Sequence, residues 1–299
     1  MGALQGAFHP IDSAEAVRFI RENKHRPFNI SLWHRSVHAS YGDEHLLAAE
    51  RNRGLYKDQP IERRLSAQPG FTVQPSLEDF AQKPPTDEDI RNIARMTVDI
   101  DDGVGEIYRA LEEEGILDRT MIIFIGDNGF FFGEHGLTEK RLAYEESIRV
   151  PFLVRYPPLI EDGSISEVSV LNIEIAPTLL ALAGIEIPET MQGRDLLPVF
   201  GGGQLETPRS ALLFEFWPET DLPGQRCWWK AVRTDDWKYV HYFKEPFYDE
   251  LYNLKDDPYE MENLIERPEQ TATVKRLQSE LSRLMELYDD QGSNYGFWD

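Results

Sequence analysis

Two adjacent oxygen-bearing side chains, Asp127 and Asn128, follow a short apolar run and are flanked by Gly126 and Gly129. Carboxylate and amide oxygens are hard ligands of the kind that calcium and magnesium prefer. The glycines permit a turn sharp enough for both side chains to reach one ion. The same tetrapeptide is also typical of an Asx turn that caps the next segment, and taken alone it favours that simpler structure.

Two ionisable side chains that could act on a bound anion, His135 and Lys140, follow shortly after this tetrapeptide. An ammonium group beside a metal-bound anion would neutralise the charge that develops on a transferred group. One returning loop could bring Lys140 to that position, although a lone lysine is more often solvated on the surface. His135 could be a ligand, a proton carrier or an exposed side chain.

A pair of histidines, His34 and His38, comes directly after residues 28–33, which alternate apolar and polar side chains as a strand does. Histidine is suited to proton transfer near neutral pH. His38 is therefore a candidate catalytic residue, and we expect one of the two histidines to be packed or hydrogen-bonded instead.

Helical and strand patterns alternate around these candidates. Residues 120–125 are apolar without polar alternation, which is typical of a strand buried on both faces of a parallel sheet. Open α/β sheets bind ligands just beyond the carboxyl ends of their strands, where Asp127 follows. Further strands are expected at 28–33 and 150–155, and further helices at 12–23 and 177–184.

The longest expected helix runs from a cap at Thr86 to a stop at Gly115. Its apolar stripe steps by three and four residues and would face the core. The stripe consists of Ile90, Ile93, Thr97, Ile100, Val104, Ile107 and Leu111. The stretch before this helix, from about residue 41 to 85, shows no sustained period and predicts a long surface excursion with short local structure.

Beyond the glycines at 201–203 the pattern changes. Short aromatic or β-branched runs at 211–216, 229–233 and 237–242 predict an antiparallel meander. Residues 273–288 predict a closing amphipathic helix. We therefore expect a domain boundary between residues 204 and 205.

The bulk composition excludes several classes of partner. The 299 residues carry 31 basic and 53 acidic side chains, a net charge of −22. A field of that sign repels nucleic acid and anionic lipid. No apolar run is long enough to span a bilayer, and the first ten residues do not have the pattern of a signal peptide. The single cysteine, Cys227, excludes an internal disulfide and a cysteine-rich zinc site.

One long segment resembles the sulfatase family of the alkaline-phosphatase-like superfamily. Residues 123–137, IFIGDNGFFFGEHGL, continue through Lys140-Arg141 into 144–151, YEESIRVP. This run is similar, in order and spacing, to the second metal-ligand segment of the family. Weaker matches cover nearly the whole chain from residue 10 onward. They are 27–38, 99–107, 172–178, GRDL at 193–196, and LYNLKDDP at 251–258 with ENL at 262–264.

The resemblance implies roles for the candidates already named. Asp127 and Asn128 would be two calcium ligands, and Lys140 would contact the sulfate oxygens. His38 would face the leaving-group oxygen and help to protonate it. His135 would lie near the substrate, with a less settled role.

The chain also departs from the family pattern. Family members open with a strand that ends in two aspartates, and carry a Cys or Ser in a C-x-P-S-R-like motif that is converted to formylglycine. A further lysine and histidine come from a G-K-W-H-like segment. None of these occurs in the 299 residues, and Cys227 lacks the downstream proline and arginine. We therefore expect Cys227 to be buried, and the chain alone to be marginally stable and inactive on sulfate esters.

The predicted fold class is α/β: a mostly parallel sheet flanked by helices, alkaline-phosphatase-like and incomplete, plus a small carboxy-terminal antiparallel sheet with a closing helix. Residues 1–204 would form a partial sulfatase catalytic domain and 205–299 a carboxy-terminal α+β subdomain.

The predicted function is calcium-dependent hydrolysis of a sulfate monoester or sulfamate. The partners would be a sulfated small molecule or glycan and possibly a separate upstream polypeptide. The alternatives are a phosphonate or phosphodiester hydrolase of the same superfamily, and a non-catalytic homologue that still binds a sulfated ligand. The specific substrate and the cellular location stay open, although full-length relatives in the family are usually exported.

Overall fold

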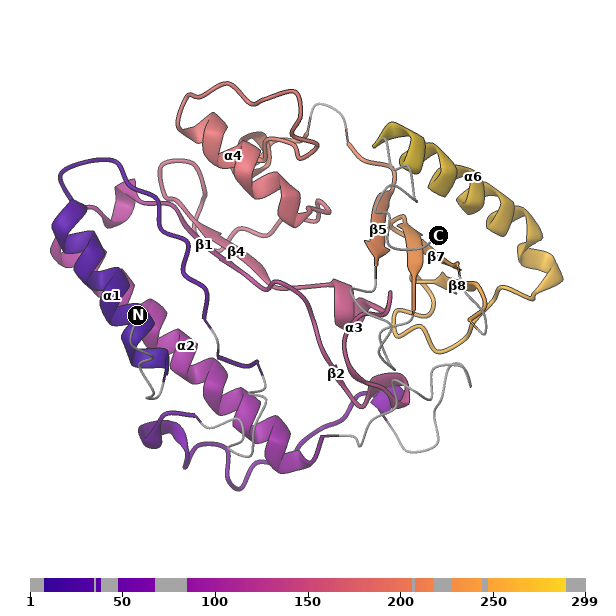
Figure 1. The fold of residues 1–299 in the computed structure, drawn as a ribbon, viewed down its shortest axis with the longest axis horizontal. Coiled ribbons are helices and arrows are strands. Elements are labelled where there is room, and N and C mark those ends of the chain that lie inside the picture. Colours follow the sequence, from indigo (N-terminus) through magenta and orange to yellow (C-terminus); the bar gives the residue numbers. More distant parts are fainter. Residues whose placement is uncertain are drawn as a thin grey trace. The chain divides into compact units, whose positions relative to one another are not determined.

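The computed structural model describes residues 8–34, 36–38, 48–67, 85–205, 208–217, 227–243 and 247–288 (Figure 1). The chain forms two compact units, which are treated separately below. Unit 1 contains residues 1–63, 85–123 and 154–158, and unit 2 contains 64–84, 124–153 and 159–299. No helix in the described ranges combines the length and apolar character needed to cross a bilayer. The expected domain boundary at residue 204 stays a prediction.

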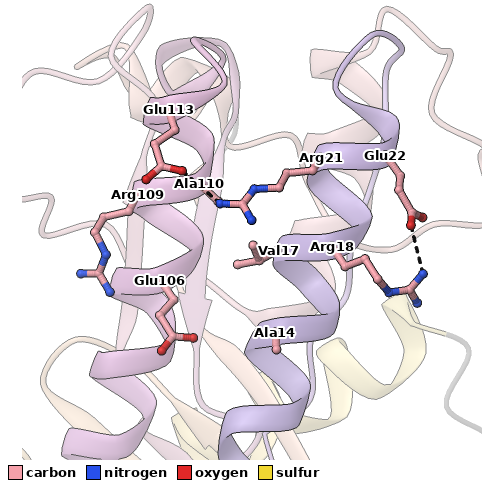
Figure 2. A pocket seen from close by; sticks show the side chains of 9 residues that line it. All are labelled: Ala14, Val17, Arg18, Arg21, Glu22, Glu106, Arg109, Ala110 and Glu113. Carbon is pink, nitrogen blue, oxygen red and sulfur yellow. Dashed lines mark hydrogen bonds and ion pairs between the residues drawn. The ribbon is translucent and has the colours of Figure 1, made fainter.

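Unit 1 is built on two helices that pack side by side (Figure 1 and Figure 2), α1 (Phe8–Asn23) and α2 (Asp87–Glu113). Thr86 caps α2 in a complete capping box with Asp89, as its sequence predicts. The helices approach closely where Gly103 faces Ser13, because a Cβ on Gly103 would lie 2.2 Å from the Ser13 hydroxyl. Short 3-10 turns, η1 (Glu50–Asn52) and η4 (Leu117–Arg119), flank the pair.

The buried stripe of α2 is broadly as predicted but contains charged residues. Ile100 and Leu111 are buried, whereas Thr97 is exposed. Asp99, which is 3% exposed, accepts hydrogen bonds from the Ala49 amide and the Asn52 side chain. These bonds satisfy a buried carboxylate and fasten residues 48–52 to the helix.

The strand expected at residues 28–33 does not form among the described residues. The segment is extended, and Phe28 packs against Ile20 and Leu111. Trp33 is 86% exposed. An alternating pattern becomes a strand only when another strand pairs with it, and no described segment does so here.

The other two expected strands form one short pair. Strand β1 (Ile122–Ile125) pairs with β4 (Phe152–Arg155). All four β1 residues are only partly buried, so burial on both faces is not observed in this pair. In unit 2, β2 (Phe131–Phe132) and β3 (Thr138–Glu139) form a small antiparallel hairpin. Three helices follow: α3 (Glu145–Ile148), α4 (Ile175–Leu182) and α5 (Leu197–Phe200).

Unit 2 also contains the predicted meander as a four-stranded antiparallel sheet in sequential order (Figure 1). Its strands are β5 (Leu212–Phe216), β6 (Trp229–Arg233), β7 (Trp237–Tyr242) and β8 (Glu250–Asn253). Helix α6 (Thr271–Leu287) packs Leu277, Leu281 and Leu284 on one face of the sheet. The other face packs against residues 131–144 and the buried Cys227. Short 3-10 turns complete the unit: η2 (Leu65–Ala67), η5 (Glu134–Gly136), η6 (Asn172–Glu174) and η7 (Pro268–Gln270).

Candidate functional site

Asp127 and Asn128 form an exposed turn at the carboxyl end of β1. The Asp127 carboxylate accepts the Asn128 amide at 2.9 Å, and the Asn128 side chain donates to the Gly129 carbonyl at 2.7 Å. Both bonds join adjacent residues, so the turn is tighter than an Asx turn, in which the side chain accepts the amide two residues further on. The remaining carboxylate and amide oxygens stay accessible to a ligand, so the turn is compatible with a metal-binding role.

Helix α3 is the point at which the candidate segments of unit 2 meet. The Gly129 amide donates to the Ser147 carbonyl at 2.8 Å, and the Arg141 amide donates to the Ser147 hydroxyl at 3.2 Å. His135 Nε2 lies 3.3 Å from the Glu146 carboxylate. Two adjacent residues, Glu146 and Ser147, thus hold all three segments. They bind Gly129 beside Asn128, Arg141 beside Lys140, and His135 itself.

Gly129 is required for this arrangement. A Cβ at that position would lie 1.9 Å from the Glu146 carbonyl oxygen, far inside van der Waals contact. The turn that carries Asp127 therefore approaches α3 closely only because residue 129 has no side chain.

The backbone around Lys140 is unusually strained. Glu139 and Arg141 on either side of it have φ of 75° and 86°, and His135 has φ of 56°. Non-glycine residues in the left-handed region are uncommon, and they concentrate at functional sites where packing holds them. Lys140 itself is partly buried, and it forms no ion pair with any residue that the structure describes. An ammonium group held in this way can receive an anion.

The strained segment is anchored to the four-stranded sheet. Trp229 donates its indole N–H to the Arg141 carbonyl at 2.7 Å. Glu145, the first residue of α3, pairs with Arg233 and Lys238, each at 3.1 Å. Burial would raise the pKa of Glu145, but these two cations outweigh it and lower that pKa. The carboxylate therefore stays ionised and fixes α3 to the sheet.

His135 is wholly buried, which favours a positioning role over the substrate contact that the resemblance implies. Its ring stacks on Tyr144 with centroids 4.3 Å apart, and it contacts Glu146. Burial would raise the pKa of Glu146, but the hydrogen bond and charge of His135, together with Arg64, lower it. The direct contact of His135 with substrate stays a prediction.

His38 belongs to unit 1, so its predicted action beside Lys140 stays a prediction. It is exposed and directly follows Val37, whose φ is 66°. A β-branched residue in that conformation is strained. The turn is fixed because the buried Ser36 hydroxyl donates to the Met96 carbonyl at 3.1 Å. His34 is half-buried beside Gly103, as expected for the structural member of the pair.

A divalent cation fits this donor set only in part. Asp127 and Asn128 offer hard oxygen ligands, yet the described residues contain no group of three or more His, Cys, Asp or Glu side chains that could hold a metal ion. Calcium takes about six to eight oxygen ligands, so most of them would have to come from other groups.

The sequence analysis missed the residues that hold the site together. Glu146 and Ser147 lie within the segment YEESIRVP, which carried the resemblance but had no assigned role. The bond from Trp229 to the Arg141 carbonyl was not predicted either. A sequence pattern could locate these residues but not their long-range hydrogen bonds.

Comparisons with known proteins match most of the chain. The family profile described as Sulfatase matches residues 13–185, and the profile N-sulphoglucosamine sulphohydrolase, C-terminal, matches residues 133–287. N-acetylglucosamine-6-O-sulfatase of Bacteroides thetaiotaomicron is 34% identical over 203 residues, which is 67% of this chain and 36% of that protein. The chain spans less than half the length of the curated relatives that it matches most strongly.

Two solved structures support the fold. A protein in complex with its substrate D-glucosamine-2-N,6-O-disulfate superimposes with a TM-score of 0.83 at 23% identity, covering 97% of this chain and 72% of that one. Phosphonate monoester hydrolase of Agrobacterium radiobacter has a TM-score of 0.60 at 26% identity, covering 68% and 43%. These likenesses confirm the predicted alkaline-phosphatase-like fold class.

Proposed function

Because this chain belongs to the sulfatase family, we propose that it is the part of a sulfuric ester hydrolase that contributes one half of the sulfate and metal site. The observation that carries the proposal is the convergence of three segments on Glu146 and Ser147. That convergence supports a site in which an exposed oxygen-ligand turn and a constrained lysine serve the same anion.

The proposed roles follow the chemistry of each side chain. Lys140 contacts the nonbridging sulfate oxygens, where a cation stabilises the charge of the transferred group. His38 protonates the leaving-group oxygen, which a histidine can do near neutral pH. His135 positions Glu146 and Tyr144, and its predicted contact with substrate is retained as a secondary role.

Asp127 and Asn128 would hold the metal ion, which we propose to be calcium. When bound, the ion supplies Lewis-acid polarisation of the sulfate oxygens. The chain's own contribution is the hydrogen-bonded turn that keeps the two oxygen-bearing side chains at the end of β1. Two protein ligands give weak affinity alone, because calcium binding strengthens with the number of charged ligands.

Turnover requires a nucleophile that these 299 residues do not contain, since no C-x-P-S-R-like or S-x-P-S-R-like motif is present. We propose that the nucleophile comes from residues outside them, in the same polypeptide or in a separate upstream one. The 299-residue chain by itself is then expected to be inactive on sulfate esters.

A sulfated sugar is the proposed substrate class. The curated relatives include proteins named N-acetylglucosamine-6-O-sulfatase and ulvan-active sulfatase. A phosphonate or phosphodiester hydrolase is the second candidate, because a phosphonate monoester hydrolase shares the fold. A non-catalytic protein that binds a sulfated ligand is the third, and the missing nucleophile motif is its support.

The deciding experiment compares substrates with the protein purified from its own host at its natural length. Sulfate monoesters and sulfamates of glucosamine are assayed beside a phosphonate monoester and a phosphodiester. The proposal predicts that sulfate release is the fastest reaction, and that the 299-residue chain alone releases none. Faster phosphonate or phosphodiester cleavage would support the second candidate, and binding of the sulfated sugar without any turnover would support the third.

A further inference from the structure

An aromatic patch lies on the four-stranded sheet of unit 2, beyond the part that α6 covers. Side chains of Val232, Tyr239 and Leu251 on this face pack under the leucines of α6. Further along the same face the strands carry no leucine, valine or isoleucine. They carry Glu215, Lys230 and His241, and the residues directly beyond the strand ends on this face are Trp217, Trp228 and Phe243. Side chains two residues apart along a strand share a face, which places each of these rings beside one of the polar residues.

Three of these rings form a column. The Trp228 ring centroid lies 4.3 Å from that of Trp217 and 4.5 Å from that of Phe243. His241 meets Phe243 edge to face at 4.5 Å. Phe243 is the outer ring and is 38% exposed.

Charged pairs border the column on both sides. Lys230 Nζ lies 5.2 Å from the Trp217 ring centroid and 3.7 Å from the Glu215 carboxylate. His241 Nδ1 lies 2.9 Å from the Asp249 carboxylate. The side chains of Glu215 and His241 are 45% and 40% exposed, whereas Lys230 is wholly buried and holds the Glu215 carboxylate from below. The patch therefore combines an exposed ring with polar groups that are fixed by their partners.

The patch is separate from the candidate sulfate site. Trp229, Ala231 and Tyr242 point to the opposite face of the sheet, where they pack with residues 131–144. Trp229 is the residue that holds the Arg141 carbonyl next to Lys140. The two surfaces thus lie on opposite faces of one sheet, and a ligand on the patch need not contact Lys140.

The chemistry of the patch fits one kind of ligand. A pyranose ring has an apolar C–H face that can cover an exposed aromatic ring, and its hydroxyls need donors and acceptors at the rim. A purely apolar partner would leave the Glu215 and Asp249 carboxylates desolvated at cost.

We propose that this aromatic patch is a carbohydrate-binding surface, with Phe243 as the stacking ring and with Glu215 and the His241–Asp249 pair as hydroxyl partners. It is a second site that binds sugar residues without acting on them. The proposal does not depend on catalysis, since it requires neither Lys140 nor a nucleophile.

The test is a calorimetric titration of the 299-residue chain with the tetrasaccharide of N-acetylglucosamine, unsulfated and 6-O-sulfated. We expect both forms to bind, because the rings contact the sugar face and not the sulfate. Phe243→Ala should weaken binding of the unsulfated form at least tenfold. Phe243→Leu should do the same while it keeps an apolar side chain, which separates loss of the ring from loss of folding.

Two matched variants complete the design. Trp33→Ala removes a tryptophan that is 86% exposed in unit 1 and should leave binding unchanged. Lys140→Ala should leave binding of the unsulfated form unchanged, because the candidate sulfate site is on the other face. The proposal is overturned if neither sugar binds, if both Phe243 variants bind normally, or if Lys140→Ala abolishes binding of the unsulfated sugar.

Discussion

At the scale of single residues, Tyr144 links the candidate site to the core. Its ring stacks on His135, and its hydroxyl donates to the buried Glu250 carboxylate at 2.8 Å. Glu250 is 1% exposed and also receives the Tyr242 hydroxyl at 3.3 Å. A buried carboxylate that loses one of its donors keeps its desolvation cost.

Tyr144→Phe should therefore lower the free energy of unfolding by about 1–3 kcal/mol, as for other buried groups left unsatisfied. Chemical denaturation of wild type and variant measures the difference. Tyr259→Phe, at a residue that is 44% exposed, is the control and should be neutral. Equal stability of wild type and Tyr144→Phe would mean that this hydrogen bond contributes nothing.

The His241–Asp249 pair predicts a pH dependence of stability. The hydrogen bond to Asp249 raises the pKa of His241 above its ordinary 6.5. The folded protein therefore binds the His241 proton more tightly than the unfolded chain does. The stability that this protonation adds to the folded state is fully present below about pH 6.5, and it is lost as the pH rises through the higher pKa of the folded state. Burial would raise the pKa of Asp249, but the bonds from His241 and Tyr239 lower it below 3.8, so its contribution persists until the pH falls through that lowered pKa.

We expect the difference in thermal midpoint between wild type and His241→Gln to shrink as pH is raised from about 6 to about 9, the range in which a perturbed histidine titrates. His25→Gln, at an exposed histidine of unit 1, should show no such trend. A difference that grows with pH would contradict the assigned direction of the shift.

At the scale of secondary-structure elements, the contribution of the α2 capping box to stability can be measured by itself, because its hydrogen bonds are local. The Thr86 hydroxyl accepts the Asp89 amide at 3.2 Å, and the Asp89 carboxylate accepts the Thr86 amide at 2.8 Å. Thr86→Ala should cost about 1 kcal/mol of stability, as is usual for loss of an N-cap. Thr97→Ala, on the exposed face of the same helix, should leave the free energy of unfolding unchanged or raise it slightly, because alanine has a higher helix propensity than threonine. Similar losses in both variants would rule out a specific capping effect.

The turn after β1 offers a second test at this scale. Gly129→Ala places a Cβ 1.9 Å from the Glu146 carbonyl, so the turn and α3 must separate. Overpacking of this kind costs about 1–3 kcal/mol. Gly54→Ala is the control, since nothing lies within 4 Å of its Cβ position. If urea denaturation shows equal stability for the two variants, the close approach of Gly129 to α3 is not needed.

Local signals predicted the elements that depend on local chemistry. The cap at Thr86 and the stop at Gly115 bracket α2, and β6 and β7 have the predicted bounds. The expected strand at 28–33 is absent because strand formation depends on a distant partner rather than on alternation. The β2–β3 hairpin and α3 went unpredicted, because elements of two to four residues carry too little periodicity.

At the scale of the whole molecule, the net charge of −22 sets how stability responds to salt. Like charges repel more strongly in the compact state than in the unfolded chain. Raising ionic strength from about 0.01 M to about 0.1 M shortens the screening length from about 30 Å to about 10 Å. We expect the thermal midpoint to rise over this range in sodium chloride. A falling midpoint would show that attractive ion pairs dominate instead.

Only part of the candidate site could be predicted from the sequence. The order of Asp127, Asn128 and Lys140 carries the family resemblance, and the matching family profile confirms the family. Their assembly depends on Ser147 and on Trp229, which lies 88 residues after Arg141 in the sequence. A contact between residues so far apart in the sequence depends on the folded structure and produces no recognisable local sequence pattern.

Sulfate release from a 6-O-sulfated glucosamine, by the protein at its natural length, measures most directly whether Lys140 contacts a sulfate ester as proposed. Lys140→Met should lower kcat/KM about 10²–10³-fold, the usual loss when one group that stabilises the transition state is removed. Lys255→Met, at an exposed lysine of unit 2, should leave the rate unchanged. A Lys140→Met protein that releases sulfate as fast as the Lys255→Met control would show that Lys140 does not act on the sulfate group.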